Sequence, residues 1–489
     1  MKRTRWLKCG ISLLLAAVLL TACAGHSGLM LPTSITLRIL TEQTESDGME
    51  SQIRELMAQF ETQHQNVNLI IDVLPADKQA RSKMLSQIYV DIHKGTGPDI
   101  YLLPAGHKAI YGHYDPNEPE PLFDDVMRFI HMGYFADISS YYKADADLDN
   151  ESLSTAIMDA GMIGGARYVL PLRYNIPVVF AETAVLKEYG LYTAMDNGID
   201  DFLDVILATE DPALAREVNL THLHGELFFN LFPPALDYEK RTASLPAGNM
   251  IRYLQLYWAA EQLSGDEEDL RTTPHIGAYI SMDEFFTQRG YSMMLSSLDH
   301  ALDAAAIAKA QGISLEILPV RAIDGSLVAD ITYYGAVGAD CAYPEVAYDF
   351  LSSFLHRDAQ WETARPQSSR SFTPGLIGYG WPVRAAGSVG PLWRNLQFQA
   401  SFYLGEDGSG WEDRAAAVAE VSLTGSDISA LSARIDTAQF HNPAEDSWGG
   451  YVAAGGTPNV DGYSAKDYAG IITSDLQSYM ESIKEDFVQ

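Results

Sequence analysis

The stretch that decides the fold runs from residue 35 to residue 103, where strand-like and helix-like patterns alternate. It opens with Ile35-Thr-Leu-Arg-Ile-Leu40, in which every second residue is apolar, as a half-buried strand requires. Residues 66–75 contain a nearly continuous apolar run, which is typical of a strand covered on both faces. Residues 99–103 read Asp-Ile-Tyr-Leu-Leu and predict a third strand.

Two amphipathic segments separate these strands. Apolar residues recur at three- and four-residue spacing within 49–60 and 84–92, so both segments are predicted to be helices, and Gly95-Thr-Gly97-Pro98 ends the second. The alternation of strand and helix predicts parallel pairing with right-handed crossovers. Ligands of such sheets bind beyond the carboxyl ends of the strands, which here lie at residues 41–42 and 104–106.

The remainder of the chain mixes both patterns without an internal repeat. We expect a helix over 123–142, two short strands over 168–180, a mainly helical region over 186–308, strands at 313–319 and 329–337, a helix at 346–355 and another over 468–483. The sequence therefore predicts an α/β fold.

Composition limits the classes of partner. The 489 residues are 47% apolar and 20% charged, which excludes a disordered chain and suffices for at least two packed domains. Lys and Arg number 33 against 65 Asp and Glu, which gives a net charge of −32. Such a chain repels phosphate backbones and anionic headgroups on average, so nucleic acid is not an expected partner.

The first residues have the pattern of an export signal. A basic start precedes an apolar run at 11–20, which is shorter than the roughly 20 residues that a membrane-spanning helix needs. The run ends in Leu20-Thr21-Ala22-Cys23, which closely resembles the bacterial lipobox, in which the Cys thiol is diacylated and the chain is cut before it. We expect residues 1–22 to be a lipoprotein signal peptide, Cys23 to carry the lipid (palmitate or a related acyl chain), and residues 23–34 to form a tether. An ordinary secretory signal with a chance Cys is the alternative.

Motifs of catalysis and metal binding are weak. The sequence lacks the G-x-S-x-G, Walker-type and H-E-x-x-H signatures. His222-x-His224-x-Glu226 could place three metal ligands on one side of a strand, but its apolar surroundings favour a structural role. The aspartates at 145, 147 and 149 imitate the start of a calcium loop without its glycine and its bidentate glutamate. Cys341 lies in an apolar stretch without a nearby His and is expected to be a small core residue. We therefore expect no metal, no cofactor and no enzymatic activity.

The order of the segments resembles the family 1 extracellular solute-binding proteins of bacterial ABC importers, the group that includes maltodextrin-binding protein. The resemblance spans nearly all of the chain after the leader. The pieces that carry it, in the family's order, are Phe60-Glu-Thr-Gln-His64 leading into the strand at 67–73, Gly97-Pro98-Asp99-Ile100, Tyr168-Val-Leu-Pro171, Lys187-Glu-Tyr-Gly190-Leu191, residues 286–294, Val346-Ala-Tyr-Asp-Phe-Leu351 and Gly380-Trp381-Pro382-Val383-Arg384.

The resemblance implies a two-lobed, periplasmic-binding-protein-like fold of type II, with the ligand in a cleft between lobes that close like a hinge. The chain would cross between the lobes three times, near 172–178, 331–338 and 378–386. Lobe 1 would comprise residues 35–173 plus 337–380, and lobe 2 residues 174–336 plus 381–489.

The same resemblance places the ligand-binding residues at the crossings and strand ends. Sugar rings offer flat C–H faces to aromatic rings and hydroxyls to planar polar groups, so a cleft that mixes both suits them. The candidates are Glu42, Tyr174, Asn175, Tyr333, Tyr334, Trp381 and Arg384. Two departures weaken the transfer of a sugar ligand. Ala181-Glu182 stands where many relatives carry Tyr-Asn, and Leu298-Asp299-His300 stands where many carry a Trp.

The expected function is that of a lipid-anchored monomeric receptor on the extracytoplasmic face of the cell membrane. It would deliver a small-molecule solute, an oligosaccharide or other carbohydrate, to the transmembrane subunits of an ABC import permease. Two alternatives stay open: a receptor that presents its ligand to a sensor kinase, and a surface glycan hydrolase with paired carboxylates.

Overall fold

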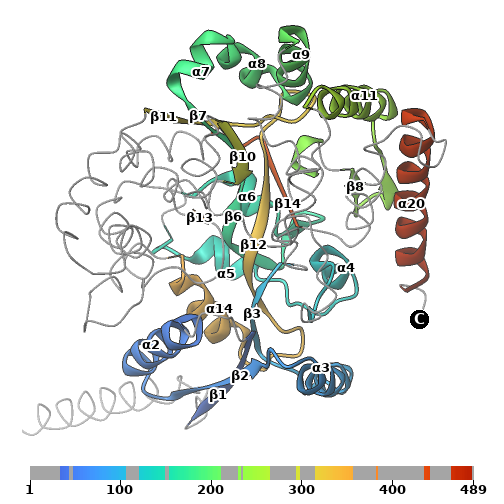
Figure 1. The fold of residues 1–489 in the computed structure, drawn as a ribbon. Coiled ribbons are helices and arrows are strands. Elements are labelled where there is room, and N and C mark those ends of the chain that lie inside the picture. Colours follow the sequence, from blue (N-terminus) through green and yellow to red (C-terminus); the bar gives the residue numbers. More distant parts are fainter. Residues whose placement is uncertain are drawn as a thin grey trace, which may run out of the picture.

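The structure is a computed structural model, and it describes residues 34–42, 48–105, 121–148, 153–210, 229–232, 235–264, 293–297, 314–355, 381–383, 434–440 and 464–486. Figure 1 shows how these residues are arranged.

The larger sheet begins with the strands that the sequence predicts. β1 (Ile35–Glu42) pairs in parallel with β2 (Val67–Leu74), with Ile35 opposite Val67, and in parallel with β3 (Ile100–Pro104). The predicted parallel pairing is thus confirmed. The burial of β3 on both faces agrees with its apolar sequence.

Later parts of the chain complete this sheet. β12 (Val328–Val337) runs antiparallel to β3 on one side and to β6 (Val169–Asn175) on the other, and β14 (Thr437–Phe440) pairs in parallel with its first residues. The order is β13-β6-β12-β3-β1-β2, where β13 is the short strand Trp381–Pro382.

Helices cover the larger sheet. They are α2 (Gly48–Gln63), α3 (Lys78–His93), α4 (Val126–His131), α5 (Ser139–Ala144), α6 (Thr155–Asp159) and α14 (Pro344–Ser353), beside the small hairpin of β4 (Met162–Ile163) and β5 (Ala166–Arg167). α3 begins where the side chain of Asp77 accepts a hydrogen bond from the Ala80 N–H, at 2.8 Å. α14 begins with a proline, which suits the first helical turn.

The predicted helix over 123–142 is wrong. Two short helices, α4 and α5, occupy this segment, and Phe135 between them forms a β-bridge with Gly338. Gly133 adopts a left-handed conformation, with φ of 76°, immediately after α4 ends. The apolar spacing that suggested one helix comes from separate elements that pack on the same sheet.

Three further strands form a smaller, separate sheet. β7 (Pro177–Glu182) runs antiparallel to β10 (Met293–Ser297) and to β11 (Leu315–Pro319). Its surroundings are α7 (Thr183–Glu188), α8 (Leu191–Asn197), α9 (Ile199–Thr209), the turn η3 (Phe229–Leu231), the hairpin of β8 (Leu236–Asp237) and β9 (Thr242–Ala243), α11 (Ala247–Ser264) and α20 (Ala465–Asp486).

The buried apolar residues form two clusters. The first core contains the inner residues of the larger sheet with α2, α3, α4 and α14, and the second core contains those of α8, α9, α11 and α20. Figure 1 shows the two groups at opposite ends of the picture with β12 passing between them. The first core also includes Tyr174, Ile331 and Phe440, which the predicted boundaries allot to the second lobe. Those boundaries stay a prediction.

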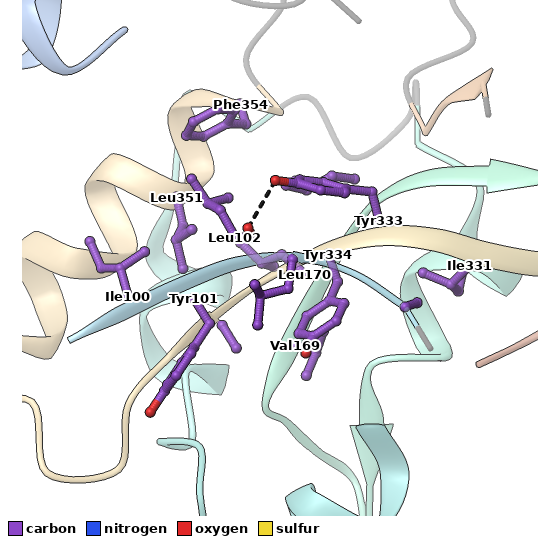
Figure 2. Packing of buried hydrophobic residues seen from close by; sticks show 14 of the residues in the cluster. Ile100, Tyr101, Leu102, Val169, Leu170, Ile331, Tyr333, Tyr334, Leu351 and Phe354 are labelled. Atoms are coloured by element: carbon purple, nitrogen blue, oxygen red, sulfur yellow. Dashed lines mark hydrogen bonds between the residues drawn. The ribbon is translucent and has the colours of Figure 1, made fainter. Parts of the chain in front are cut away.

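α14 packs closely on β12 at Gly335. A Cβ on Gly335 would lie 2.7 Å from Leu351 Cδ2, so a side chain at this position would force the Leu351 side chain to shift. Figure 2 shows Leu351 and Phe354 above this part of the sheet, together with Leu102 and Leu170.

No helix in the described ranges has the length and apolar content to cross a membrane.

Candidate ligand-binding site

Several strand ends of the larger sheet meet at one edge. β1 ends at Glu42 and β3 at Pro104, and the antiparallel β12 places Tyr333 opposite Pro104. β6 places Arg173 opposite the same Tyr333. The sequence predicts a ligand site at the carboxyl ends of the strands, and this edge is where polar side chains of β1, β6 and β12 gather.

The phenol of Tyr333 is held from two sides. Tyr333 Oη donates a hydrogen bond of 2.9 Å to the Leu102 carbonyl, drawn in Figure 2, and lies 3.3 Å from Thr41 Oγ1, which then donates to it. Burial raises the pKa of Tyr333, so its hydroxyl stays protonated at any ordinary pH. The hydroxyl therefore links β12 to Thr41 near the end of β1 and to Leu102 in the middle of β3.

Glu42 forms a buried ion pair. Its Oε1 lies 2.7 Å from Arg81 Nη2 of α3, and the two side chains are 6% and 2% exposed. Arg81 Nη1 also donates to the Pro75 carbonyl, at 3.4 Å. Two charges out of water are tolerated when they are paired and hydrogen-bonded. Arg81 thus anchors the side chain that ends β1.

A second buried arginine lies on β6. Arg173 is 3% exposed, and burial lowers the pKa of its guanidinium to about 9, while the nearby Tyr333 raises it. A guanidinium in such surroundings favours any negative or strongly hydrogen-bonding group placed beside it. Arg173 places a positive charge at this edge, on β6 directly opposite Tyr333 of β12.

β6 pairs here with β13 on one side and with β12 on the other. Trp381 of β13 pairs with Tyr174 of β6, and Asn175 pairs with Asp330 of β12. The register between β6 and β12 shifts at Tyr333, an irregularity of the kind found where strands bend. The residues after Asn175 continue directly into β7 of the smaller sheet.

Tyr334 and Tyr174 lie within the first core. Tyr334 packs edge-on against Phe440, with ring centroids 5.9 Å apart, and against Phe135, at 6.4 Å. Its hydroxyl is buried and has no hydrogen-bond partner among the described residues, and burial raises its pKa strongly. In this conformation both tyrosines act as packing residues.

The structure places the predicted site residues in one sheet but not on one face. Glu42 lies on β1, Tyr174 and Asn175 on β6, Tyr333 and Tyr334 on β12, and the backbone of Trp381 on β13. Because Tyr333 and Tyr334 are consecutive on a strand, their side chains lie on opposite faces of the sheet, as Figure 2 shows. Asn175 is partly exposed, whereas Glu42 and the three tyrosines are buried. Cys23, Arg384, Asp299 and His300 lie outside the described residues, as does the segment 222–226. A ligand-binding role of any of these residues stays a prediction.

Sequence reasoning missed two residues of this edge, Arg81 and Arg173. Arg81 falls four residues before Leu85, on the apolar face of α3, and Arg173 interrupts the apolar run of β6. A charged residue on an otherwise buried face is a signal that it has a partner inside the protein. The sequence contained this signal, but it did not show which residues would be the partners of Arg81 and Arg173.

A hollow of about 510 Å³ lies at the opposite edge of the sheet. Pro98, which precedes β3, and Gly338, which follows β12, line it together with His93, Tyr101 and Tyr134. It lies away from the strand ends described above and is not part of the candidate site.

The described part of the chain contains no group of three or more His, Cys, Asp or Glu side chains placed to hold a metal ion. Burial raises the pKa of the half-buried Cys341 to about 12, so its thiol stays protonated and unreactive near neutral pH.

No family model matches the sequence, and no curated protein matches it. Solved structures are similar in fold at low identity. A family 1 extracellular solute-binding protein from Alicyclobacillus acidocaldarius is 13% identical with a TM-score of 0.53, covering 92% of this chain and 99% of that one. The galacto-N-biose-/lacto-N-biose I-binding protein of the ABC transporter from Bifidobacterium longum, in complex with lacto-N-biose, is 14% identical with a TM-score of 0.51, covering 93% and 98%.

A de novo designed cysteine esterase, ECH19, is also similar, at 12% identity and a TM-score of 0.54 over 92% of this chain and 99% of that one. The fold alone therefore does not separate binding from catalysis. It does agree with the resemblance seen in the sequence: the chain has the mixed α/β fold of the family 1 extracellular solute-binding proteins.

Proposed function

We propose that this protein is a solute-binding receptor that holds a carbohydrate, an oligosaccharide in particular, between its two cores and delivers it to the transmembrane subunits of an ABC import permease. The observation that carries the proposal is the meeting of β1, β3, β6, β12 and β13 at one edge of the sheet, beside the strand that leads into the second core. In open α/β sheets ligands bind at such edges.

The side chains at this edge suit a neutral, hydroxyl-rich ligand. Asn175 is the partly exposed polar side chain here, and its amide can pair with sugar hydroxyls. Thr41, Glu42 and Tyr333 are buried and bonded within the protein, so in our proposal they hold the strand ends in place. Trp381 would supply an aromatic face. The relative from Bifidobacterium longum was solved with lacto-N-biose, which supports the carbohydrate class for this chain.

The two cores give the mechanism its physical basis. A ligand that contacts both cores realises its full binding energy only when they meet, so its binding favours the closed arrangement. The closed form would then dock on the permease. The three crossings predicted from the sequence are the hinge of this motion in our proposal.

A thermal-shift screen of the protein against oligosaccharides, monosaccharides, peptides and polyamines tests the proposal. A ligand at 100 times its dissociation constant stabilises the folded state by about 2.7 kcal/mol, which is a readily measured shift. We expect one oligosaccharide class to shift the melting temperature and to be recovered intact by chromatography. Hydrolysis products would indicate a glycan hydrolase instead, and a shift with peptides or amines alone would overturn the carbohydrate assignment.

We further propose that Cys23 anchors the receptor to the extracytoplasmic face of the membrane, because the residues before it have the order of a lipobox. Two acyl chains suffice for stable anchoring. Mass spectrometry of the protein from its native membrane is expected to find Cys23 as the first residue with a diacylglyceryl group attached. A first residue elsewhere, with a free Cys23 thiol, would contradict the anchor.

A further inference from the structure

A buried carboxyl joins the two cores on a different side from the candidate ligand site. Asp125 precedes α4 and is fully buried. Its Oδ1 accepts a hydrogen bond of 3.0 Å from the Arg128 N–H, which caps the helix. Its Oδ2 accepts a hydrogen bond of 2.8 Å from Tyr238 Oη and a second one from Tyr479 Oη.

The three residues belong to different cores. Asp125 lies between Phe123 and Val126, which are both part of the first core. Tyr238 follows β8, whose Leu236 packs against the second core. Tyr479 lies on α20, whose residues Tyr468, Ile472 and Leu476 are buried in the second core. Two phenols of one core thus donate to a single carboxyl oxygen of the other.

Neighbouring contacts extend this junction. Oε1 of Glu239, at the tip of the β8–β9 hairpin, accepts a hydrogen bond of 2.6 Å from the Gly164 N–H in the turn between β4 and β5. The ring of His131, at the end of α4, stacks on Tyr238 with centroids 6.1 Å apart and planes 22° apart. The hairpin of the second core therefore rests on two separate elements of the first.

Movement of one core against the other would have to break this junction. The chain passes between the cores through the link from β6 to β7 and the link from β11 to β12, and such strand links permit rotation. Separation of the phenols from Asp125 would leave a buried carboxyl without its donors, which is unfavourable. The connecting strands alone would allow the cores to rotate against each other, and the junction opposes that rotation.

We propose that Asp125, Tyr238 and Tyr479 form an interlobe lock that holds the two cores in the described orientation, and that the cores rotate about their connecting strands when the lock opens. The lock lies on elements outside the candidate ligand site, but the motion that it restrains is the hinge motion of the proposed function, so the inference deepens that proposal. The spin-label test below and the ligand screen above are separate measurements, so either can fail without the other.

The distance between the cores reports whether the lock is closed or open. Spin labels at Gln59→Cys on α2 and Thr193→Cys on α8, both exposed positions, report this distance by pulsed electron resonance in a chain whose Cys9, Cys23 and Cys341 are replaced by Ser. Tyr479→Phe removes one donor and keeps the ring. We expect it to increase the population of a second interlobe distance roughly fivefold, the factor that one ordinary hydrogen bond carries.

The chain offers matched controls within each core. Tyr348 Oη donates to Asp145 Oδ2 at 3.1 Å inside the first core, and Tyr192 Oη donates to Glu316 Oε1 at 2.6 Å inside the second. Tyr348→Phe and Tyr192→Phe are expected to leave the distance distribution unchanged even if they lower the melting temperature.

The proposal is overturned if Tyr479→Phe, shown to be folded by circular dichroism, gives the same distance distribution as these controls. If Tyr479→Phe fails to fold, Tyr238→Phe replaces it with the same two readouts. A unimodal, unshifted distribution in that variant also overturns the lock.

Discussion

At the residue scale, the ion pair of Glu42 and Arg81 determines how β1 ends. Both side chains are buried, and the guanidinium holds the carboxylate at the edge where the strands meet. Pairs of this kind add little stability relative to well-packed apolar residues, but loss of one partner leaves an uncompensated charge inside the protein. The pair therefore matters more for the position of the Glu42 side chain than for the net stability of the protein.

Glu42→Ala is expected to lower the free energy of unfolding by about 3–5 kcal/mol, because Arg81 would stay buried without its carboxylate. Urea denaturation measures this loss. Asp196→Ala is the control, since Asp196 pairs with Arg434 at 3.0 Å on the surface, where both side chains are largely exposed and the pair contributes little. Equal losses in the two variants would show that the Glu42 pair has no special role.

The pH dependence of stability is expected to reveal Asp125. Burial raises the pKa of its carboxyl, opposed by hydrogen bonds from Tyr479, the Arg128 N–H and Tyr238, while the neighbouring Asp124 raises it. Because the folded state then binds this proton more tightly than the unfolded state, stability falls as pH rises from about 4 through the folded-state pKa. Asp125→Asn is expected to remove that part of the decline in a series of urea titrations. An identical pH profile in wild type and variant would contradict the raised pKa.

At the element scale, the strands and most helices could be predicted because their apolar periodicity is local. β1, β2 and β3 form where alternating or continuous apolar runs predict them, and the predicted strand at 329–337 agrees with β12 within one residue. The prediction of one helix over 123–142 was wrong because Gly133 divides the segment and Phe135 pairs with Gly338. That contact spans about two hundred residues of sequence, so it leaves no local pattern.

Packing between α14 and β12 gives a second test at this scale. Gly335→Ala is expected to destabilise the protein by about 1–3 kcal/mol, because the new methyl group would lie 2.7 Å from Leu351 Cδ2 and 3.5 Å from Leu102 Cδ2. Thermal or urea denaturation measures the loss. Gly470→Ala on the exposed face of α20 is the control, since nothing lies within 4 Å of its Cβ position and alanine favours the helix by about 0.5–1 kcal/mol. A Gly335 variant as stable as wild type would mean that α14 packs less closely than described.

At the scale of the whole molecule, two hydrophobic cores share one set of connecting strands. The sequence resemblance predicted this class of fold, and the solved structures agree with it at 13% identity. It could not predict which side chains at the strand ends are buried, because burial of Tyr174, Tyr333 and Tyr334 depends on segments that are distant in sequence.

The chain has a net charge of −32, which is expected to disfavour anionic solutes through long-range repulsion.

If the solute binds beside the paired strands β6, β12 and β13, titration calorimetry with the carbohydrate that the screen identifies will show it most directly. Asn175→Ala is the informative variant, because Asn175 is a partly exposed member of the predicted site. We expect a roughly tenfold rise in the dissociation constant, because a buried ligand group would lose a hydrogen bond that it needs. His93→Ala in the distant hollow and Asn197→Ala on α8 are predicted to bind as the wild type does. Unchanged affinity in Asn175→Ala together with weakened binding in His93→Ala would contradict the claim and move the ligand to the hollow.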